Sequence, residues 1–111
     1  MGRSLVISTF PEMVQIVDNR AMVTARIKGI SPDAGNPGHH ALDMELEEAA
    51  PVPGFAQLVT EKPGDTLRVV MPSQLLDAGK ALPGDRYRLL VRAGAGKYFY
   101  AGAAAPEKLN T

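Results

Sequence analysis

Apolar and polar side chains alternate with a period of two along several stretches of this chain. Residues 21–28 read AMVTARIK, so that Ala, Val, Ala and Ile occupy every second position. Residues 40–48 repeat the pattern, with Leu, Met and Leu separated by acidic side chains. This period is typical of a β-strand with one buried face. We predict one strand over residues 13–30, interrupted by a bulge, bend or turn at residues 18–20, and another over residues 40–48.

These two strands fit together as an antiparallel hairpin about the Gly- and Pro-rich loop of residues 31–40. One register satisfies both faces, because it pairs opposite charges outside and apolar residues inside. Opposite charges that face each other across a ladder contribute about 0.2–1 kcal/mol each. The register sets Arg26 opposite Glu45, Lys28 opposite Asp43, Ile27 opposite Met44 and Ala25 opposite Leu46.

The phrase Pro-Gly-Asp occurs twice, at residues 63–65 and 83–85, and an alternating segment follows each copy. Proline presets φ, glycine supplies a positive φ, and aspartate bonds back to the turn backbone. Each copy therefore predicts a tight turn that opens a strand. The two strands cover residues 66–71 and 86–92.

A short helix and a short last strand complete the predicted elements. Pro72 ends the third strand, Ser73 is a suitable N-cap for a helix of one or two turns, and Gly79 marks the helix end. The last strand covers residues 97–101, with Phe99 as its core residue. On the strand before it, the alternation places three side chains inside: Tyr87, Leu89 and Val91.

The order of these elements resembles that of the OB-fold, a five-stranded Greek-key barrel. The resemblance covers residues 13–101 and implies an all-β fold: a five-stranded OB-like Greek-key barrel with one short helix between strands 3 and 4. We expect residues 1–12 to form an N-terminal extension or an extra strand. Residues 102–111 are expected to be a flexible tail.

Residues 70–85 also resemble segments of two other families. In molybdate-binding OB-like domains a short helix and a Gly-Asp turn lead into a strand, and this resemblance implies a small-anion site at a subunit interface. In swapped-hairpin transcription regulators a strand, a proline, a helix and Gly-Asp follow in the same order. Those domains are much shorter than this chain and would leave its first half unexplained.

Composition narrows the class of function. With 111 residues, the chain is long enough for one domain and one modest core. It has no cysteine, which excludes a disulfide scaffold and suits the reducing cytoplasm, its expected location. The formal net charge is zero, whereas proteins that bind nucleic acid nonspecifically usually carry a basic excess. No apolar run approaches the ~20 residues of a membrane-spanning helix, so no membrane partner is expected.

The motifs that suggest catalysis or cofactors have simpler structural explanations. The sequence GAGK at residues 94–97 lacks the earlier glycine, the following Ser or Thr and the helix of a P-loop. Adjacent His39 and His40 point to opposite sides of an extended chain and are poorly placed to share a metal ion. The acidic residues of 43–48 form a charge ladder beside the basic residues of the facing strand. We therefore expect no enzyme activity, no cofactor and no metal site.

The last predicted hairpin carries the candidate binding surface. Its outward side chains combine aromatic rings with cations, as a base-stacking surface requires. Charge is also segregated along the chain, since residues 68–100 have a formal charge of +4 and residues 1–67 one of −4. The candidate binding residues are Arg88, Arg92, Lys97, Tyr98 and Tyr100.

Two classes of function suit this pattern. The first is a small noncatalytic binding domain, acting as a protein-interaction or assembly module, with self-association included. The alternative is binding of single-stranded nucleic acid through the basic and aromatic face of the last hairpin.

Overall fold

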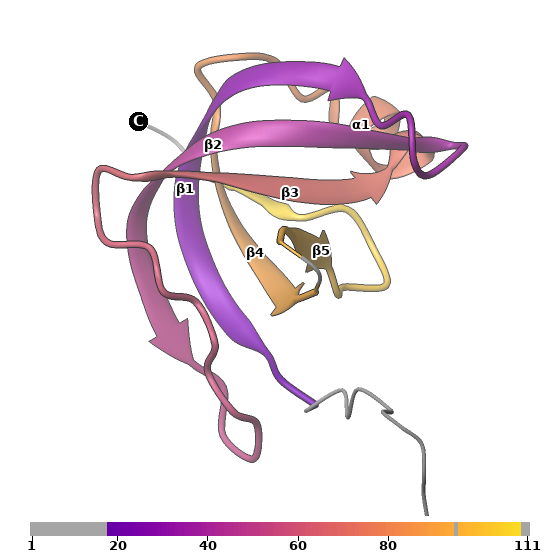
Figure 1. Ribbon diagram of the computed structural model, residues 1–111. Coiled ribbons are helices and arrows are strands. Elements are labelled where there is room, and N and C mark those ends of the chain that lie inside the picture. Colours follow the sequence, from indigo (N-terminus) through magenta and orange to yellow (C-terminus); the bar gives the residue numbers. More distant parts are fainter. Residues whose placement is uncertain (1–17, 95, 110–111) are drawn as a thin grey trace, which may run out of the picture.

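The computed structural model describes residues 18–94 and 96–109 as a barrel of strands with one short helix (Figure 1). The expected N-terminal extension, residues 1–12, and the start of the first predicted strand lie outside the described residues. The predicted order of three strands, a helix and two strands is confirmed, and one further short strand follows. The elements are β1 (Ala21–Pro32), β2 (His39–Pro51), β3 (Thr66–Pro72), α1 (Ser73–Gly79), β4 (Arg86–Ala93), β5 (Tyr98–Tyr100) and β6 (Glu107–Leu109).

Five of these strands close into a barrel. They are joined in the order β1-β2-β3-β5-β4, and β4 pairs again with β1. Within the barrel, β3 and β5 run parallel and the other pairs run antiparallel. This confirms the predicted fold class, an all-β, five-stranded OB-like Greek-key barrel with one short helix between β3 and β4. In Figure 1 the strands wrap around a common interior and α1 lies at one end of it.

The β1–β2 hairpin keeps most of the predicted register, with one correction. A bulge at Lys28 sets Gly29 opposite Asp43, so the predicted pairing of Lys28 with Asp43 is wrong. A strand that coils around a barrel needs such bulges, and the alternation of side chains does not reveal where they fall. Asp43 pairs instead with Arg68 on β3, at 3.1 Å between Oδ1 and Nε. The confirmed pairs are Arg26–Glu45, Ile27–Met44 and Ala25–Leu46.

The two Pro-Gly-Asp phrases form turns of the same construction. We call residues 63–65 the first turn and residues 83–85 the second turn. In both, the glycine has a φ of +96°, which only glycine adopts without strain. In both, the aspartate side chain accepts the N–H of the residue before the proline, from Lys62 at 2.9 Å and from Leu82 at 3.0 Å. The repeated phrase is therefore a repeated structural unit.

Each turn docks on a strand immediately before a bulge. The N–H and C=O of Leu46 on β2 bond to the first turn at 2.9 and 2.8 Å, and those of Ile27 on β1 bond to the second turn at 2.9 and 2.8 Å. The register shifts at the next residue in each case, at Glu47 on β2 and at Lys28 on β1. The turns thus start β3 and β4 at corresponding corners of the barrel.

A single hydrophobic core fills the barrel. Alternate side chains of β1 and β4 point inward as predicted, with Tyr87, Leu89 and Val91 among them. Leu76 of α1 is 7% exposed and joins this core from the end of the barrel. The central side chains, each at most 1% exposed, include Val23, Met44, Leu46, Val69, Leu89 and Val91.

The start of α1 differs from the prediction. Pro72 occupies the N-cap position without a side-chain cap bond, and Ser73 is the first helical residue. The Ser73 N–H bonds instead to the carbonyl of Gly38 at 2.9 Å, which ties the helix to the β1–β2 loop. Helix α1 ends at Gly79 as predicted, and Lys80 follows in the left-handed conformation with a φ of 52°.

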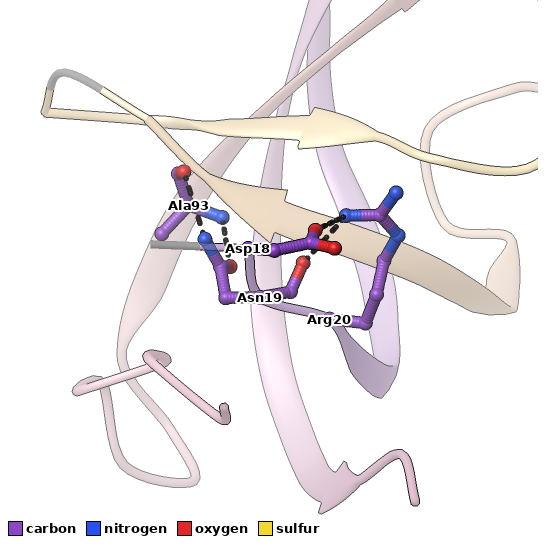
Figure 2. Close-up of polar contacts among 4 residues, drawn as sticks. All are labelled: Asp18, Asn19, Arg20 and Ala93. Carbon is purple, nitrogen blue, oxygen red and sulfur yellow. Dashed lines mark hydrogen bonds and ion pairs between the residues drawn. The ribbon is translucent and has the colours of Figure 1, made fainter. Parts of the chain in front are cut away.

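Residues 18–20 anchor the beginning of β1. Asn19 is 5% exposed, and its side chain acts as a strand partner of Ala93. Its Oδ1 accepts the Ala93 N–H at 2.7 Å, and its Nδ2 donates to the Ala93 carbonyl at 3.4 Å (Figure 2). Arg20 Nη1 donates to Asp18 Oδ1 at 3.1 Å and to the Asn19 carbonyl at 2.7 Å. The Asn19 side chain therefore extends the β1–β4 pairing beyond the backbone ladder.

Within the expected flexible tail of residues 102–111, Glu107–Leu109 form the strand β6. β6 pairs antiparallel with β4, beside the part of β4 that pairs with β5. Two ion pairs accompany the strand, Glu107 with Arg88 at 3.2 Å and Lys108 with Asp85 at 3.3 Å. Backbone pairing and charge together hold this segment against the barrel.

Candidate binding surfaces

The inward and outward side chains of β5 are the reverse of those predicted. Tyr98 is 7% exposed and belongs to the barrel core, whereas Phe99 lies outside that core. The prediction of an exposed Tyr98 and a core Phe99 is wrong, because a strand of three residues has too few alternations to fix its phase. The Tyr98 hydroxyl donates to Glu61 Oε1 at 2.5 Å and accepts the Thr60 N–H at 3.4 Å. Burial raises the pKa of Tyr98, and the nearby Glu61 carboxylate raises it further.

Tyr100, the other predicted aromatic site residue, is half-buried. Its hydroxyl donates a hydrogen bond to the carbonyl of Ala104, so the ring is tied to the segment that leads to β6. Burial raises the pKa of this hydroxyl as well. Tyr100 therefore presents only part of its ring to a partner.

Two of the three predicted basic residues gather on Phe99. The Arg92 guanidinium carbon lies 5.2 Å and the Lys97 Nζ 5.7 Å from the centre of the Phe99 ring, within the range of cation–π attraction. Arg88 pairs instead with Glu107 of β6. The structure thus brings Arg92 and Lys97 together, but around Phe99 rather than around Tyr98 or Tyr100.

Phe99 continues a row of apolar side chains on the outside of the barrel. The registers set Ala41 of β2, Val70 of β3 and Phe99 of β5 side by side, with Arg92 of β4 next in the row. Ala41 and Val70 are 3% and 1% exposed although they lie outside the barrel core. The outer surface is therefore covered at this point. We call these residues, together with Lys97, the Phe99 face.

The β1–β2 loop reaches the same face. Lys97 Nζ lies 3.6 Å from Asp33 Oδ2. Asn36 Nδ2 donates to the same carboxylate oxygen at 2.5 Å. The hydrogen bond from Asn36 lowers the pKa of Asp33, and the charge of Lys97 lowers it further. The ion pair thus joins the β1–β2 loop to Lys97, which lies between β4 and β5.

Much of the basic side that the charge distribution suggested is neutralised by ion pairs. These pairs join strands and turns across the surface, so most of the cations concerned have a carboxylate within direct contact. A broad surface of free cations, on which phosphate binding depends, does not result. The pairs are Arg20–Asp18, Arg68–Asp43, Arg86–Glu47, Arg88–Glu107, Lys97–Asp33 and Lys108–Asp85.

A groove opens between α1 and the adjoining end of the barrel. We call it the α1 groove. On its rim, Leu82 is 63% exposed, compared with 38% for Phe55 and 42% for Leu58, the other exposed large apolar residues of the described chain. The groove has a volume of about 290 Å³ and is lined by Ile30, His40, Leu76, Asp77, Lys80, Ala81 and Leu82.

Sequence reasoning missed this groove, because its walls come from β1, β2, α1 and the segment before the second turn. One signal in the sequence does point to it. The residue before the proline is Lys62 in the first turn and Leu82 in the second turn. A charged residue suits an exposed turn, so a leucine at the equivalent position is the exception.

One wall of the groove carries a contact between a histidine and a serine. His40 Nδ1 lies 2.5 Å from Ser73 Oγ. A serine nucleophile also needs a group that orients the other histidine nitrogen. Among residues 18–94 and 96–109, no carboxylate is hydrogen-bonded to His40. The contact fastens the first residue of α1 to the start of β2.

Comparison with known proteins finds no match for this chain, either among protein-family models or among the curated proteins searched. Within residues 18–94 and 96–109, no helix is long and apolar enough to cross a membrane. The same part of the chain holds no group of three or more His, Cys, Asp or Glu side chains placed to bind a metal ion. The Phe99 face and the α1 groove are therefore the features of the described residues that bear on function.

Proposed function

We propose that this chain is a small noncatalytic protein-interaction or assembly domain that binds its partner at the α1 groove. The observation that carries the proposal is Leu82, 63% exposed on the rim of a groove that is lined in part by apolar side chains. Apolar surface beside a hollow with a few polar groups is typical of an interaction site. Zero net charge and the ion pairing of the basic residues favour a protein partner over nucleic acid.

The strand order and the parallel β3–β5 pairing support placing the barrel in the OB-fold. OB-type barrels serve many binding functions, so the fold is compatible with this role without specifying the partner.

Panning a phage-displayed random peptide library on the purified chain tests the proposal. We expect enriched peptides whose binding is lost in Leu82→Lys, because a charged side chain on the rim cannot be desolvated cheaply. The matched control is Lys62→Leu, which changes the equivalent position of the first turn and should leave peptide binding intact. Peptides that bind Leu82→Lys as well as the wild type would contradict the proposal.

A second candidate function is the binding of single-stranded nucleic acid at the Phe99 face. It is favoured by the aromatic ring of Phe99, which lies between Arg92 and Lys97 on the outside of the barrel. Base stacking on an aromatic side chain contributes about 1–3 kcal/mol per base, and neighbouring cations attract the phosphates. The site is narrow, because Lys97 already pairs with Asp33.

Fluorescence anisotropy of a labelled oligothymidylate, measured across a salt series, tests the second candidate. If it holds, binding weakens as salt rises and is lost in Phe99→Ala and in Arg92→Ala, whereas the control Lys62→Ala binds like the wild type. An unchanged anisotropy at the lowest salt concentration excludes it. This result leaves the α1 groove unaffected, because the two surfaces involve different residues.

A further inference from the structure

We propose that the partner at the α1 groove is a second copy of this chain, related by a two-fold axis that sets Leu82 of each copy into the groove of the other. This inference rests on the proposed function and makes it more specific. It depends on three features of the groove: a rigid apolar projection, a hollow beside it, and charges of both signs on the same rim.

The first feature is the rigid support of Leu82. Its N–H donates to Asp85 Oδ2 at 3.0 Å, and its carbonyl accepts the Asp85 N–H at 3.1 Å. The turn itself is fixed to Ile27 of β1 by backbone hydrogen bonds. Because this backbone is already ordered, binding through Leu82 has no loop-ordering cost at this position, which favours association.

The structure of the turn does not require an apolar residue at this position. The first turn has the same hydrogen bonds and the same glycine φ, with Lys62 in place of Leu82. The geometry of the turn therefore does not account for an apolar side chain at position 82. Burial against another surface gives this leucine a physical role.

The second feature is the hollow next to Leu82. The apolar part of its wall consists of Ile30, Leu76 and Ala81, and its volume of about 290 Å³ exceeds that of one leucine side chain. Leu76 is 7% exposed and belongs to the barrel core, so the floor of the groove is firm. Since the projection and the hollow lie on the same patch, two copies can fill each other's grooves in one closed contact.

The third feature is the pair of opposite charges, Asp77 and Lys80. Both line the groove, and neither takes part in an ion pair with another described residue. The Lys80 backbone is held by the bond of its N–H to the Asp77 carbonyl at 3.2 Å. In a two-fold contact residue i meets residue j and j meets i, so each Asp77 can pair with Lys80 of the other copy. A head-to-tail contact would lack this reciprocity.

Sedimentation velocity over a concentration series gives the first test. We expect the weight-average mass of the wild type to rise toward that of a dimer in the micromolar range, because a contact formed by one leucine from each copy and two ion pairs falls in the class of small, weak interfaces. Leu82→Lys should remain monomeric, and Lys62→Leu should dimerise like the wild type. A wild type that stays monomeric throughout, or a Leu82→Lys variant that dimerises equally well, overturns the proposal.

Charge exchange gives a second test that is specific for the two-fold arrangement. Asp77→Lys and Lys80→Asp each place like charges together across the axis, so each variant alone should be monomeric. A mixture of the two should form a heterodimer, and the double variant should recover the homodimer, since both restore opposite charges. Aspartate is among the residues that tolerate the left-handed conformation at position 80. If the mixture stays monomeric while the wild type dimerises, this axis is wrong.

The outcome also separates this inference from the function on which it rests. If the wild type is monomeric but displayed peptides still bind in a manner that depends on Leu82, the groove is a protein-binding site and the second copy is not its partner. If neither self-association nor peptide binding depends on Leu82, both proposals fail. Circular dichroism melting curves of each variant confirm that only folded proteins are compared.

Discussion

The first and second turns share a backbone and differ in what their side chains do. Both rest on a strand just before a bulge, and both start a strand whose second residue is 2% exposed, Leu67 after the first turn and Tyr87 after the second. The residue before the proline is a lysine in one and a leucine in the other. The comparison teaches that Pro-Gly-Asp fixes the path of the chain and leaves the outward positions free to acquire a role in binding.

The largest difference between the two turns is expected at the buried position that follows each of them. Leu67→Ala leaves a cavity in the core, and we expect the free energy of unfolding to fall by about 2–5 kcal/mol. Tyr87→Phe should leave it unchanged or raise it, because the Tyr87 hydroxyl is buried without a hydrogen-bond partner among the described residues. Urea denaturation measures both. A loss in Tyr87→Phe comparable to that in Leu67→Ala would show that the hydroxyl has a partner inside the barrel.

Alanine substitution of the two turn glycines should lower the free energy of unfolding by equal amounts. Gly64→Ala and Gly84→Ala each force a Cβ onto a backbone with a φ of +96°, and no atom lies within 4 Å of that Cβ at either site. Backbone strain alone then sets the cost, about 1–2 kcal/mol for each variant. Thermal or urea unfolding of the two variants provides the measurement. Clearly unequal losses would show that the two turns are not equivalent.

Alanine substitution of the two turn aspartates should lower the free energy of unfolding by slightly different amounts. Asp65→Ala and Asp85→Ala each remove the acceptor for the N–H before the proline, at a cost of about 1 kcal/mol. Asp85 also pairs with Lys108 of β6, so its substitution should cost a few tenths of a kcal/mol more at low salt. The excess should disappear in high salt, as measured by unfolding at two ionic strengths. An excess that persists in high salt would locate the difference in the turn rather than in the ion pair.

A smaller, pH-dependent effect is expected at the ion pair that links the two turn sites. Glu47 is next to Leu46, the residue on which the first turn docks, and Arg86 directly follows the second turn. Glu47 Oε1 lies 2.6 Å from Arg86 Nη2. The hydrogen bonds from Arg86 lower the pKa of Glu47 below its ordinary value of 4.5. The pair therefore stabilises the fold above the ordinary pKa, and this stability is lost as the pH falls through the lowered pKa.

Melting temperatures of the wild type and Glu47→Gln, compared at neutral and acidic pH, test this. We expect the wild type to melt higher at neutral pH and the difference to close in acid. Glu48→Gln is the control, since Glu48 takes part in no ion pair among the described residues. A difference between the wild type and Glu47→Gln that is constant with pH would assign the effect to packing.

The sequence predicted the barrel well where its strands are long. β1 and β2 contain many alternations, so their buried faces and most of their register followed from the pattern of side chains. β5 spans only Tyr98–Tyr100, and its phase depends on the backbone of the preceding turn, where Gly96 has a φ of +75°. The sequence also did not predict the bulge at Lys28, because the curvature of the barrel rather than local composition decides where a strand bulges.

The candidate site was less accessible to prediction. Arg92 and Lys97 were predicted as binding residues and do lie together, but the ring between them is Phe99. The α1 groove could not be predicted from local patterns, since its walls come from four separate segments. The sequence itself shows only that Lys62 precedes the first Pro-Gly-Asp and Leu82 the second. This contrast points to the groove only once the two turns are known to have the same geometry.

The return of β4 to β1 has a consequence for synthesis. Ala21 at the start of β1 pairs with Val91 near the end of β4, while the other edge of β1 is taken by β2 of the same hairpin. On the ribosome, a nascent chain that already holds the β1–β2 hairpin must wait until β4, Arg86–Ala93, has emerged before the open edge of β1 is covered. An unpaired strand edge invites pairing with other chains. Premature termination or stalling before β4 emerges should therefore yield a product that needs chaperone protection or clearance.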